Sequence, residues 1–237
     1  MSSPPASPVA NANARALLAG ASGLVGSLCL RKLLGGSSFA KVTAVARRPL
    51  GVADARLEVI LTDLGQLAQV PAVPAGAALS ALGTTIAKAG SQGAFRQVDH
   101  DGVVSFARWA RQGGATTFVL VSSVGAAAGA RSFYLRVKAE TEDAVNELGF
   151  SRTVILRPSL LLGTRHDRRT GEAIAQTVLP PLNPLLLGPL RIYRAIAAET
   201  VAAAMVAAAS ASQPGKFVWH HDEIVAAAGA AHLGVAA

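Results

Sequence analysis

A tyrosine and a lysine four residues apart are the side chains in this sequence best suited to acid–base chemistry. Tyr134 and Lys138 stand in the segment Tyr-Leu-Arg-Val-Lys, and this spacing places both on one face of a helix. An unassisted phenol has a pKa of about 10 and exchanges protons poorly at neutral pH. A nearby ammonium group favours the phenolate and so suits a phenol to general acid–base catalysis. The alternative is an exposed tyrosine beside a solvated lysine.

A serine extends this pair into a candidate catalytic set. Ser122 and Ser123 end a β-rich run that begins at Thr117 and precedes Tyr134. The hydroxyl of Ser123 would hold a substrate oxygen beside the phenol, while Lys138 could also bind the ribose of a nicotinamide cofactor. Ser123, Tyr134 and Lys138 are therefore predicted to be catalytic.

Three glycines near the start of the chain predict a phosphate-binding turn. They lie between a short apolar run and a segment with helical periodicity. In this context such glycines allow a tight turn, a close approach to a pyrophosphate and close packing of the helix. The backbone N–H groups at the helix start then face the phosphate oxygens. Ordinary turns in a chain with 23 glycines are the alternative. The predicted contacts are Gly20, Ser22, Gly23, Leu24, Val25 and Gly26.

The residues that follow the other strands indicate which nucleotide binds, because ligands of an open parallel sheet lie beyond the carboxyl ends of its strands. Arg47 and Arg48 follow the second strand, where an acidic residue would bind the ribose of NAD and arginine suits the 2′-phosphate of NADP. NADP(H) is therefore preferred over NAD(H), although two solvated arginines before a turn are the alternative. Further cofactor contacts are predicted at Asp63 and Leu64, at Leu82, Gly83 and Thr84, and at Lys138.

Two of these contacts have a specific chemical reason. Asp63 could accept a hydrogen bond from adenine, and Gly83 permits the backbone to approach a ribose closely.

Short β-rich runs alternate with helical segments, a pattern typical of a parallel sheet with helices on both faces. Strands are expected at Ala16–Ala19, Lys41–Ala46, Leu57–Leu61, Ala77–Leu82, Thr117–Ser123, Thr153–Leu156 and, at an edge, Phe217–Trp219. Helices are expected at Leu24–Leu34, around Phe95–Arg111, at Tyr134–Leu148 and at Ala198–Ala209. The predicted class is α/β: a Rossmann-like doubly wound parallel sheet in one domain over residues 13–237, with a small C-terminal extension on the substrate side. Residues 1–12, rich in proline and serine, are expected to be a disordered tail.

Together these motifs resemble the short-chain dehydrogenase/reductase superfamily. The segments Ala81–Asp101, Phe133–Glu140 and Ile155–Ser159 are similar to its atypical, Tat-interacting-protein-like members. The resemblance runs from about residue 16 to about residue 208 and is weakest in the proline-rich loop. It implies a Rossmann-like fold, NADP(H) at the glycine turn, the catalytic set named above and Pro158 against the nicotinamide. Leu-Gly-Thr-Thr replaces the asparagine-rich motif of better-known members, so a fourth, proton-relaying residue is not assigned.

The predicted function is an NADP(H)-dependent oxidoreductase in which Tyr134 exchanges a proton with the substrate oxygen. A small or apolar carbonyl or alcohol is favoured, because little chain follows Pro158 to form the separate substrate lobe of nucleotide-sugar epimerases. Two alternatives remain at this point: a non-enzymatic NADP(H)-binding regulator or assembly factor, and an epimerase or dehydratase with tightly held cofactor.

Charge and hydropathy restrict the partners. The net charge is +8, from 22 basic and 14 acidic residues, but the arginines are scattered without interleaved aromatics, so nucleic acid is not expected. The longest apolar run is too short to span a membrane, and the first residues lack the pattern of a secretory signal. We therefore expect a cytoplasmic monomer or homodimer that binds a small-molecule substrate.

Several other segments have weaker interpretations. Cys29, amid apolar residues, is expected to be a buried structural thiol. His220–Glu223 is expected to be a surface run and not a metal site, and no metal is predicted. Asp99–Asp101 is interpreted as charge favourably placed at a helix start. The loop Leu179–Leu190 could pack over the sheet, line the substrate pocket, form a subunit contact or touch a membrane surface. Arg165, Arg168 and Arg169 are equally consistent with an anionic substrate and with a solvated loop.

Overall fold

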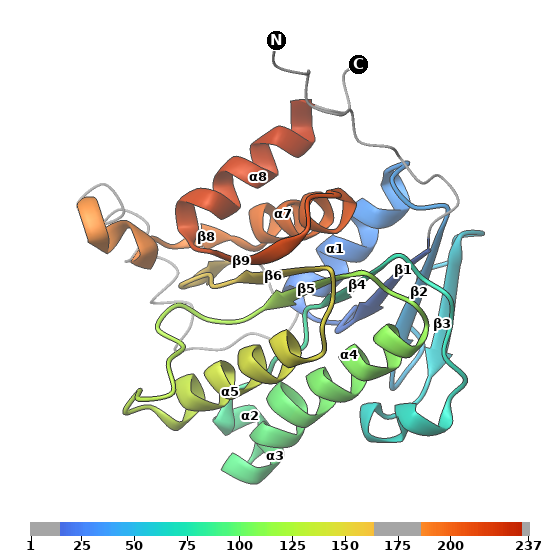
Figure 1. The fold of residues 1–237 in the computed structure, drawn as a ribbon, viewed down its shortest axis with the longest axis horizontal. Coiled ribbons are helices and arrows are strands. Elements are labelled where there is room, and N and C mark those ends of the chain that lie inside the picture. The colour runs from blue at the N-terminus through green and yellow to red at the C-terminus, as the bar shows by residue number, and fades with distance from the viewer. Residues whose placement is uncertain (1–14, 164–185, 234–237) are drawn as a thin grey trace.

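Seven parallel strands form the central sheet of the structure, a computed structural model that describes residues 15–163 and 186–233 (Figure 1). The spatial order is β3-β2-β1-β4-β5-β6-β9. The strands are β1 (Arg15–Ala19), β2 (Lys41–Ala46), β3 (Leu57–Leu61), β4 (Ala77–Ser80), β5 (Thr117–Val121), β6 (Arg152–Leu156) and β9 (Gly215–Trp219). The chain reverses its direction across the sheet between β1 and β4, and such a switch point opens a crevice at the carboxyl ends of the strands. The predicted fold class is confirmed.

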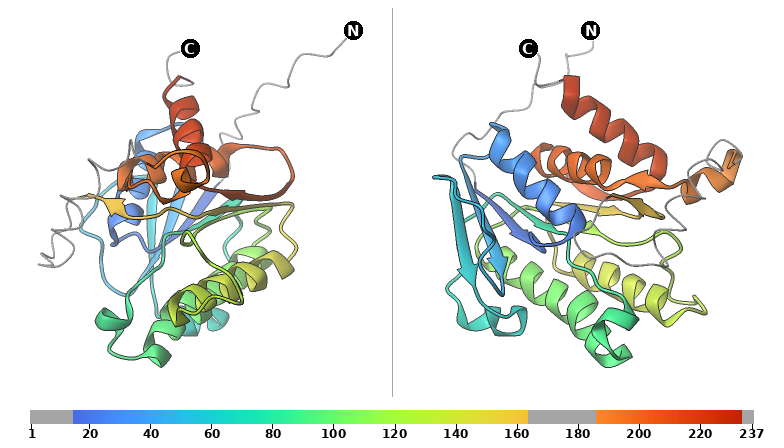
Figure 2. Two further views of the ribbon diagram at one scale, coloured as in Figure 1. Left: turned by 90° about the vertical axis from the view of Figure 1, so that its left-hand side faces the viewer. Right: turned by 180° about the vertical axis from the view of Figure 1, so that it is seen from behind.

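Helices cover both faces of this sheet, as the two views in Figure 2 show. One face carries α1 (Leu24–Gly35), α7 (Ala198–Ser210) and α8 (His221–Leu233). The other carries α2 (Ile86–Ala89), α3 (Gln92–Arg96), α4 (Gly102–Gln112) and α5 (Phe133–Glu147). Shorter elements are the 3₁₀ helices η1 (Leu64–Gln69) and η4 (Gly188–Tyr193), the π-helical turn η2 (Gln97–Asp101), and a two-stranded sheet of β7 (Leu161–Leu162) and β8 (Ile196–Ala197).

Two apolar clusters fill the layers on either side of the sheet. Leu18 of β1 points into the layer under α1 and α7, and its neighbour Leu17 points into the layer over α4 and α5. This alternation is the ordinary consequence of strand geometry. The alanines of α7 are almost all buried, which lets α7 pack closely between α1 and α8 (Figure 1).

The strand predictions are confirmed, with small differences at one end of five strands: β1, β6 and β9 begin earlier than expected, and β4 and β5 end earlier. Ala77–Leu82 and Thr117–Ser123 were expected as strands, and both end earlier in the structure. The chain after β5 nevertheless continues along β6, because Ser122 N–H donates to the Leu156 carbonyl at 2.7 Å and Val124 N–H donates to the Pro158 carbonyl at 3.0 Å. Two neighbouring strand ends therefore stay paired where the candidate site lies.

Helix predictions were less complete. The helix expected around Phe95–Arg111 is three consecutive segments, α3, η2 and α4. The run His220–Glu223, expected to lie at the surface, is half-buried to exposed and leads into α8, where Glu223 accepts a hydrogen bond from His220 N–H at 3.0 Å. Among the described residues after Pro158, α7, β9 and α8 belong to the main layers, and β7 with β8 forms the separate two-stranded sheet.

Some predictions fall on residues that the structure does not describe. These are the tail at residues 1–12, Arg165, Arg168 and Arg169, and the proline-rich loop up to residue 185. The described end of that loop enters η4, where Leu187 and Leu190 are exposed.

Candidate functional site

The glycine turn joins β1 to α1 and is packed backbone against backbone. Gly20 has φ +84°, a left-handed conformation that favours glycine, and a Cβ atom there would lie 2.6 Å from the Ala81 carbonyl oxygen. A Cβ atom on Gly26 would lie only 2.0 Å from the Gly20 carbonyl oxygen. Gly23 N–H donates to the same oxygen at 2.9 Å, which closes the turn. The helix thus approaches the turn itself more closely than any side chain would allow.

The first turn of α1 has the properties of an anion-binding site. Among the described residues, no side chain caps this turn, and it contains no acidic residue. Ser22 and Gly23 are exposed at the helix start, and Leu24 is half-buried. Free N–H groups at the positive end of a helix dipole bind phosphate oxygens. The turn therefore fits a dinucleotide pyrophosphate.

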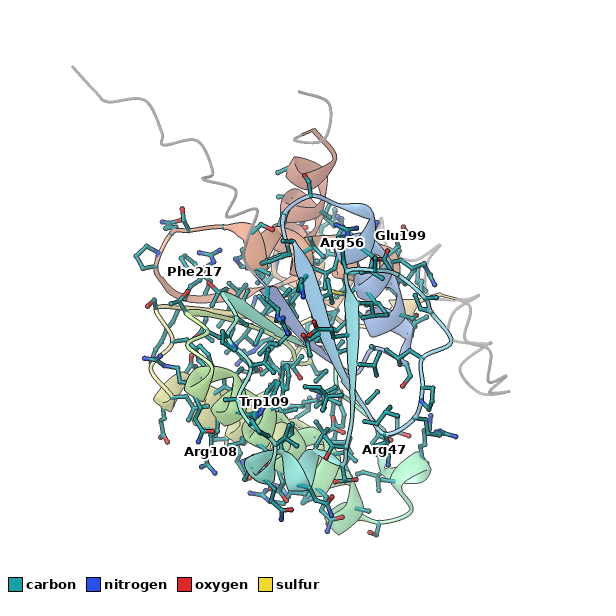
Figure 3. The ribbon with its side chains drawn as sticks, turned by 90° about the vertical axis from the view of Figure 1, so that its right-hand side faces the viewer. Arg47, Arg56, Arg108, Trp109, Glu199 and Phe217 are labelled. Carbon is teal, nitrogen blue, oxygen red and sulfur yellow. The ribbon has the colours of Figure 1, made fainter. Side chains whose placement is uncertain are left out.

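Four further predicted contacts lie at neighbouring strand ends. Arg47 and Arg48 are exposed directly after β2, and Figure 3 shows Arg47 at the opposite end of the sheet from Arg56. Asp63 is exposed after β3, and its Oδ1 accepts a hydrogen bond from Gly65 N–H at 2.9 Å as the cap of η1. Leu64 is half-buried beside α4. The arginines are thus available to a phosphate, while one oxygen of Asp63 is already engaged.

Lys138 is buried at the centre of the candidate site. Its side chain is 5% exposed, and Nζ lies 2.8 Å from Oδ1 of Asp99, whose side chain is fully buried. Burial lowers the pKa of the Lys138 ammonium, but the carboxylate of Asp99, helped by Tyr134 and Glu142, outweighs it, so this pKa lies above its ordinary value. The lysine is therefore a buried cation at neutral pH.

The loop after β4 lies directly over this ion pair. Thr84 N–H donates to Oδ2 of Asp99 at 2.8 Å. A Cβ atom on Gly83 would lie 3.6 Å from Asp99 Oδ1 and 3.8 Å from Lys138 Nζ. Leu82 is partly buried against the layer of α4 and α5. The predicted ribose contacts at Gly83 and Thr84 are thereby brought together with the predicted catalytic lysine.

Tyr134 lies one helical turn before Lys138 and is half-buried. Lys138 Nζ is 5.9 Å from the centroid of the Tyr134 ring, and the ring packs against Phe95 of α3 with centroids 5.4 Å apart. Ser123 is half-buried at the end of β5, where its hydroxyl donates weakly to the Val124 carbonyl at 3.3 Å. Tyr134 and Lys138 are thus neighbours on α5, and Ser123 lies just beyond the end of β5.

A second buried carboxylate anchors α5 to the strand ends. Glu142 accepts a hydrogen bond from the hydroxyl of Ser122, and Arg157 Nε donates to Glu142 Oε1 at 3.0 Å. Arg157 immediately precedes Pro158, the buried residue expected beside the nicotinamide. Ser122 therefore has a structural partner in Glu142, whereas the hydroxyl of Ser123 contacts only the neighbouring Val124 carbonyl among the described residues.

Sequence reasoning missed Asp99, Glu142, Arg157 and Phe95. Asp99 was interpreted as charge at a helix start; it does lie in the first turn of η2, but its side chain is buried and paired with Lys138. A signal was present: Asp99 falls four residues after Phe95 and four before Val103, on the apolar stripe of its helix. A carboxylate on such a stripe must find a buried partner.

The fold and the glycine turn together define a Rossmann-type nucleotide-binding protein. A family model described as NAD(P)H-binding matches residues 20–212, and the chain belongs to this family. Curated relatives include mitochondrial protein Fmp52 of Emericella nidulans, 35% identical over 175 residues that cover 69% of this chain and 73% of the relative. Another is mitochondrial Fmp52 of Eremothecium gossypii, 39% identical over 164 residues that cover 68% of this chain and 73% of the relative.

Solved structures support the fold. A UDP-N-acetylglucosamine 4-epimerase from Methanobrevibacter ruminantium aligns with a TM-score of 0.65 at 15% identity, over 88% of this chain and 76% of the epimerase. MoeE5 in complex with UDP-glucose and NAD aligns with a TM-score of 0.64 at 18% identity, over 90% and 80% of the two chains. The chain is thus a member of the NAD(P)H-binding family with a Rossmann-like fold.

The names of the relatives correct one prediction. The expected cytoplasmic location is contradicted, because the Fmp52 relatives are named mitochondrial proteins. That expectation rested on the sequence patterns typical of secretory signals and membrane spans, and neither pattern reports on import into an organelle. Within the described ranges, no helix is both long and apolar enough to cross a bilayer. The same residues contain no group of three or more side chains arranged to hold a metal ion.

Proposed function

We propose that this protein is an NADP(H)-dependent oxidoreductase of the mitochondrion that interconverts a small or apolar carbonyl compound and its alcohol. The observation that carries the proposal is the buried, charged Lys138 beneath the Gly83–Thr84 loop, one helical turn from Tyr134. Such a cation would donate to the ribose hydroxyls of a dinucleotide whose pyrophosphate is bound at the start of α1. Membership of an NAD(P)H-binding family supports the nucleotide.

Each residue of the site would have a distinct task. The amides of Leu24 and Val25 would bind the pyrophosphate, and Arg47 with Arg48 would pair with the 2′-phosphate that distinguishes NADP from NAD. An ammonium group has three donors, and Asp99 is its one ion-pair partner among the described residues, so Lys138 keeps donors for ribose hydroxyls. When bound, the cofactor supplies or accepts the hydride.

Proton transfer falls to the remaining side chains. The hydroxyl of Tyr134 would give a proton to the substrate oxygen during reduction and take one during oxidation. Ser123 would hold that oxygen beside the phenol, and Phe95 keeps the ring in place. The buried position of Lys138 places a positive charge close to the developing phenolate, where low polarity strengthens the attraction.

The proposal is tested first by binding. Calorimetry with NADPH and NADH should show tighter binding of NADPH, and the double variant Arg47→Ala/Arg48→Ala should weaken NADPH binding about tenfold or more while leaving NADH unchanged. Arg108→Ala, an exposed arginine on α4, is the matched control and should change neither affinity (Figure 3). Absence of affinity for both nucleotides would refute the proposal.

The catalytic step is tested by turnover with a panel of aldehydes and ketones. Tyr134→Phe should lower kcat by about 100-fold or more, because it removes the proton donor and keeps the ring. Tyr193→Phe is the matched control, since this second tyrosine lies exposed on η4. Tight NADPH binding without turnover would instead favour a regulator, and cofactor retained without net oxidation would favour an epimerase or dehydratase.

A further inference from the structure

Asp99 has a position that the proposed chemistry does not by itself require. It lies in η2, the single π-helical turn between α3 and α4, where Gly102 N–H donates to the Gln97 carbonyl five residues earlier. The wider turn adds one residue to the helical run and so changes which side chains face α5. Turns of this kind are frequent at functional sites. Here the turn places a carboxylate against α5 and the loop after β4.

Both carboxylate oxygens and the backbone carbonyl of Asp99 contact elements of the candidate site. Oδ1 lies 2.8 Å from Lys138 Nζ, and Oδ2 accepts from Thr84 N–H at 2.8 Å. The backbone carbonyl of Asp99 accepts from the hydroxyl of Thr141 at 3.0 Å, one turn further along α5 than Lys138. One residue thus joins the loop after β4 to the helix that carries the tyrosine and lysine.

We propose that Asp99 is a positioning residue that holds the Lys138 ammonium charged and fixed against the Gly83–Thr84 loop before any cofactor arrives. The inference rests on the proposed function, because it concerns the lysine assigned there to the ribose. Without this carboxylate, a lysine side chain that is 5% exposed would have to lose its proton or leave its site. With it, the cofactor meets a donor that is already in place.

The charged groups around Lys138 come from two elements. Asp99 lies on η2, and Tyr134 and Glu142 lie on α5 itself. Glu142 is also paired with Arg157, so Asp99 is the carboxylate in direct contact with the ammonium. The loop after β4 contributes only backbone, through Thr84 N–H. Removal of the Asp99 charge alone is therefore expected to change the ionisation of the lysine.

The test is titration of the lysines by NMR in protein labelled with [ε-¹³C]lysine, without cofactor. The chain has five lysines, and the Lys138→Met variant assigns the signal. In wild type, Lys138 should stay protonated to a higher pH than the exposed Lys88 and Lys216. In Asp99→Asn, which keeps an acceptor for Thr84 N–H, its titration should fall below theirs by more than about one pH unit.

Asp101→Asn is the matched control, because Asp101 lies two residues away on the same turn with its side chain 56% exposed. It should leave the titration unchanged. An Asp99→Asn protein in which Lys138 titrates as in wild type would overturn the proposal. If the Asp99→Asn variant does not fold, the titration of the wild-type protein still tests the proposal. A wild-type Lys138 that loses its proton at a lower pH than Lys88 would overturn the proposal equally.

Cofactor affinity gives the second readout. Asp99→Asn should weaken NADPH binding about tenfold, increasingly so as the pH rises, and Asp101→Asn should not. A shifted lysine titration with unchanged NADPH affinity would contradict the positioning role. Should wild type bind neither nucleotide, the proposed function fails, whereas the pairing of Asp99 with Lys138 is still decided by the titration.

Discussion

Two regions of the candidate site are built in different ways. The glycine turn between β1 and α1 is a contiguous stretch in which backbone packs on backbone, and its Gly20 carbonyl is approached by both Gly23 and Gly26. The polar side chains of α5 are held by partners from η2, β5 and β6, which are far away in the sequence. The first region depends on the absence of side chains, and the second depends on their exact pairing with distant residues.

This difference shows which kind of substitution would destabilise each region. A turn made of backbone fails when any atom is added, because neither the helix nor the strand can move away. A buried polar network fails when one partner is neutralised, because the remaining charge stays in a place that water does not reach. Two substitutions separate these two kinds of failure, and a third, at a half-exposed ion pair on an edge strand, supplies the comparison with the surface.

The largest effect is expected from Gly26→Ala. The added Cβ would lie 2.0 Å from the Gly20 carbonyl oxygen, so the turn must deform, and we expect a loss of about 3 kcal/mol in the free energy of unfolding. Gly35→Ala is the control at the other end of α1, where a Cβ meets nothing within 4 Å. Denaturant unfolding measures both. Equal stability of the two variants would show that the turn is not tightly packed.

A smaller effect is expected from Glu142→Gln. Neutralising this buried carboxylate leaves Arg157 without its charged partner, and we expect a loss of about 2 kcal/mol. Glu140→Gln is the control on the same helix, because Glu140 pairs with Arg96 at the surface and should contribute less than about 1 kcal/mol. The prediction fails if urea midpoints of both variants shift equally.

The smallest effect is expected from Glu58→Gln on the exposed edge strand β3. Lys41, with Arg15, lowers the pKa of the Glu58 carboxyl below its ordinary value. A lowered folded-state pKa means that the stabilisation is present above the unfolded pKa of about 4.3 and is lost as the pH falls through the folded value.

Solvent screens this half-exposed pair, so wild type should exceed the variant by no more than about 0.5 kcal/mol at neutral pH. The difference should vanish in acid and shrink in high salt. Unfolding curves at neutral pH and at about pH 3 check this. A difference that persists in acid would mean that Glu58 stabilises β3 by packing and not by charge.

Much of the fold could be predicted from local patterns. The apolar runs of β2 and β3 were found to the residue, since short β-branched runs between polar turns have few other interpretations. The helix α8 was not predicted, because its alanines and single glycine show no apolar periodicity and its first residues are histidines and acids. The burial of Cys29 was expected and is confirmed; burial raises the pKa of its thiol to about 12.

The residues of the candidate site fall into the same two groups: those that local sequence patterns reveal and those that they do not. Glycine spacing, Tyr134 and Lys138 can be recognised in the sequence because a turn and a helix face are formed by residues a few positions apart. Asp99 and Glu142 could not be assigned partners in that way, since their partners are brought to them only when the sheet is assembled and the helices cover it. Local sequence thus specifies which groups are available for chemistry, whereas three-dimensional packing decides which of them are charged, held and brought together.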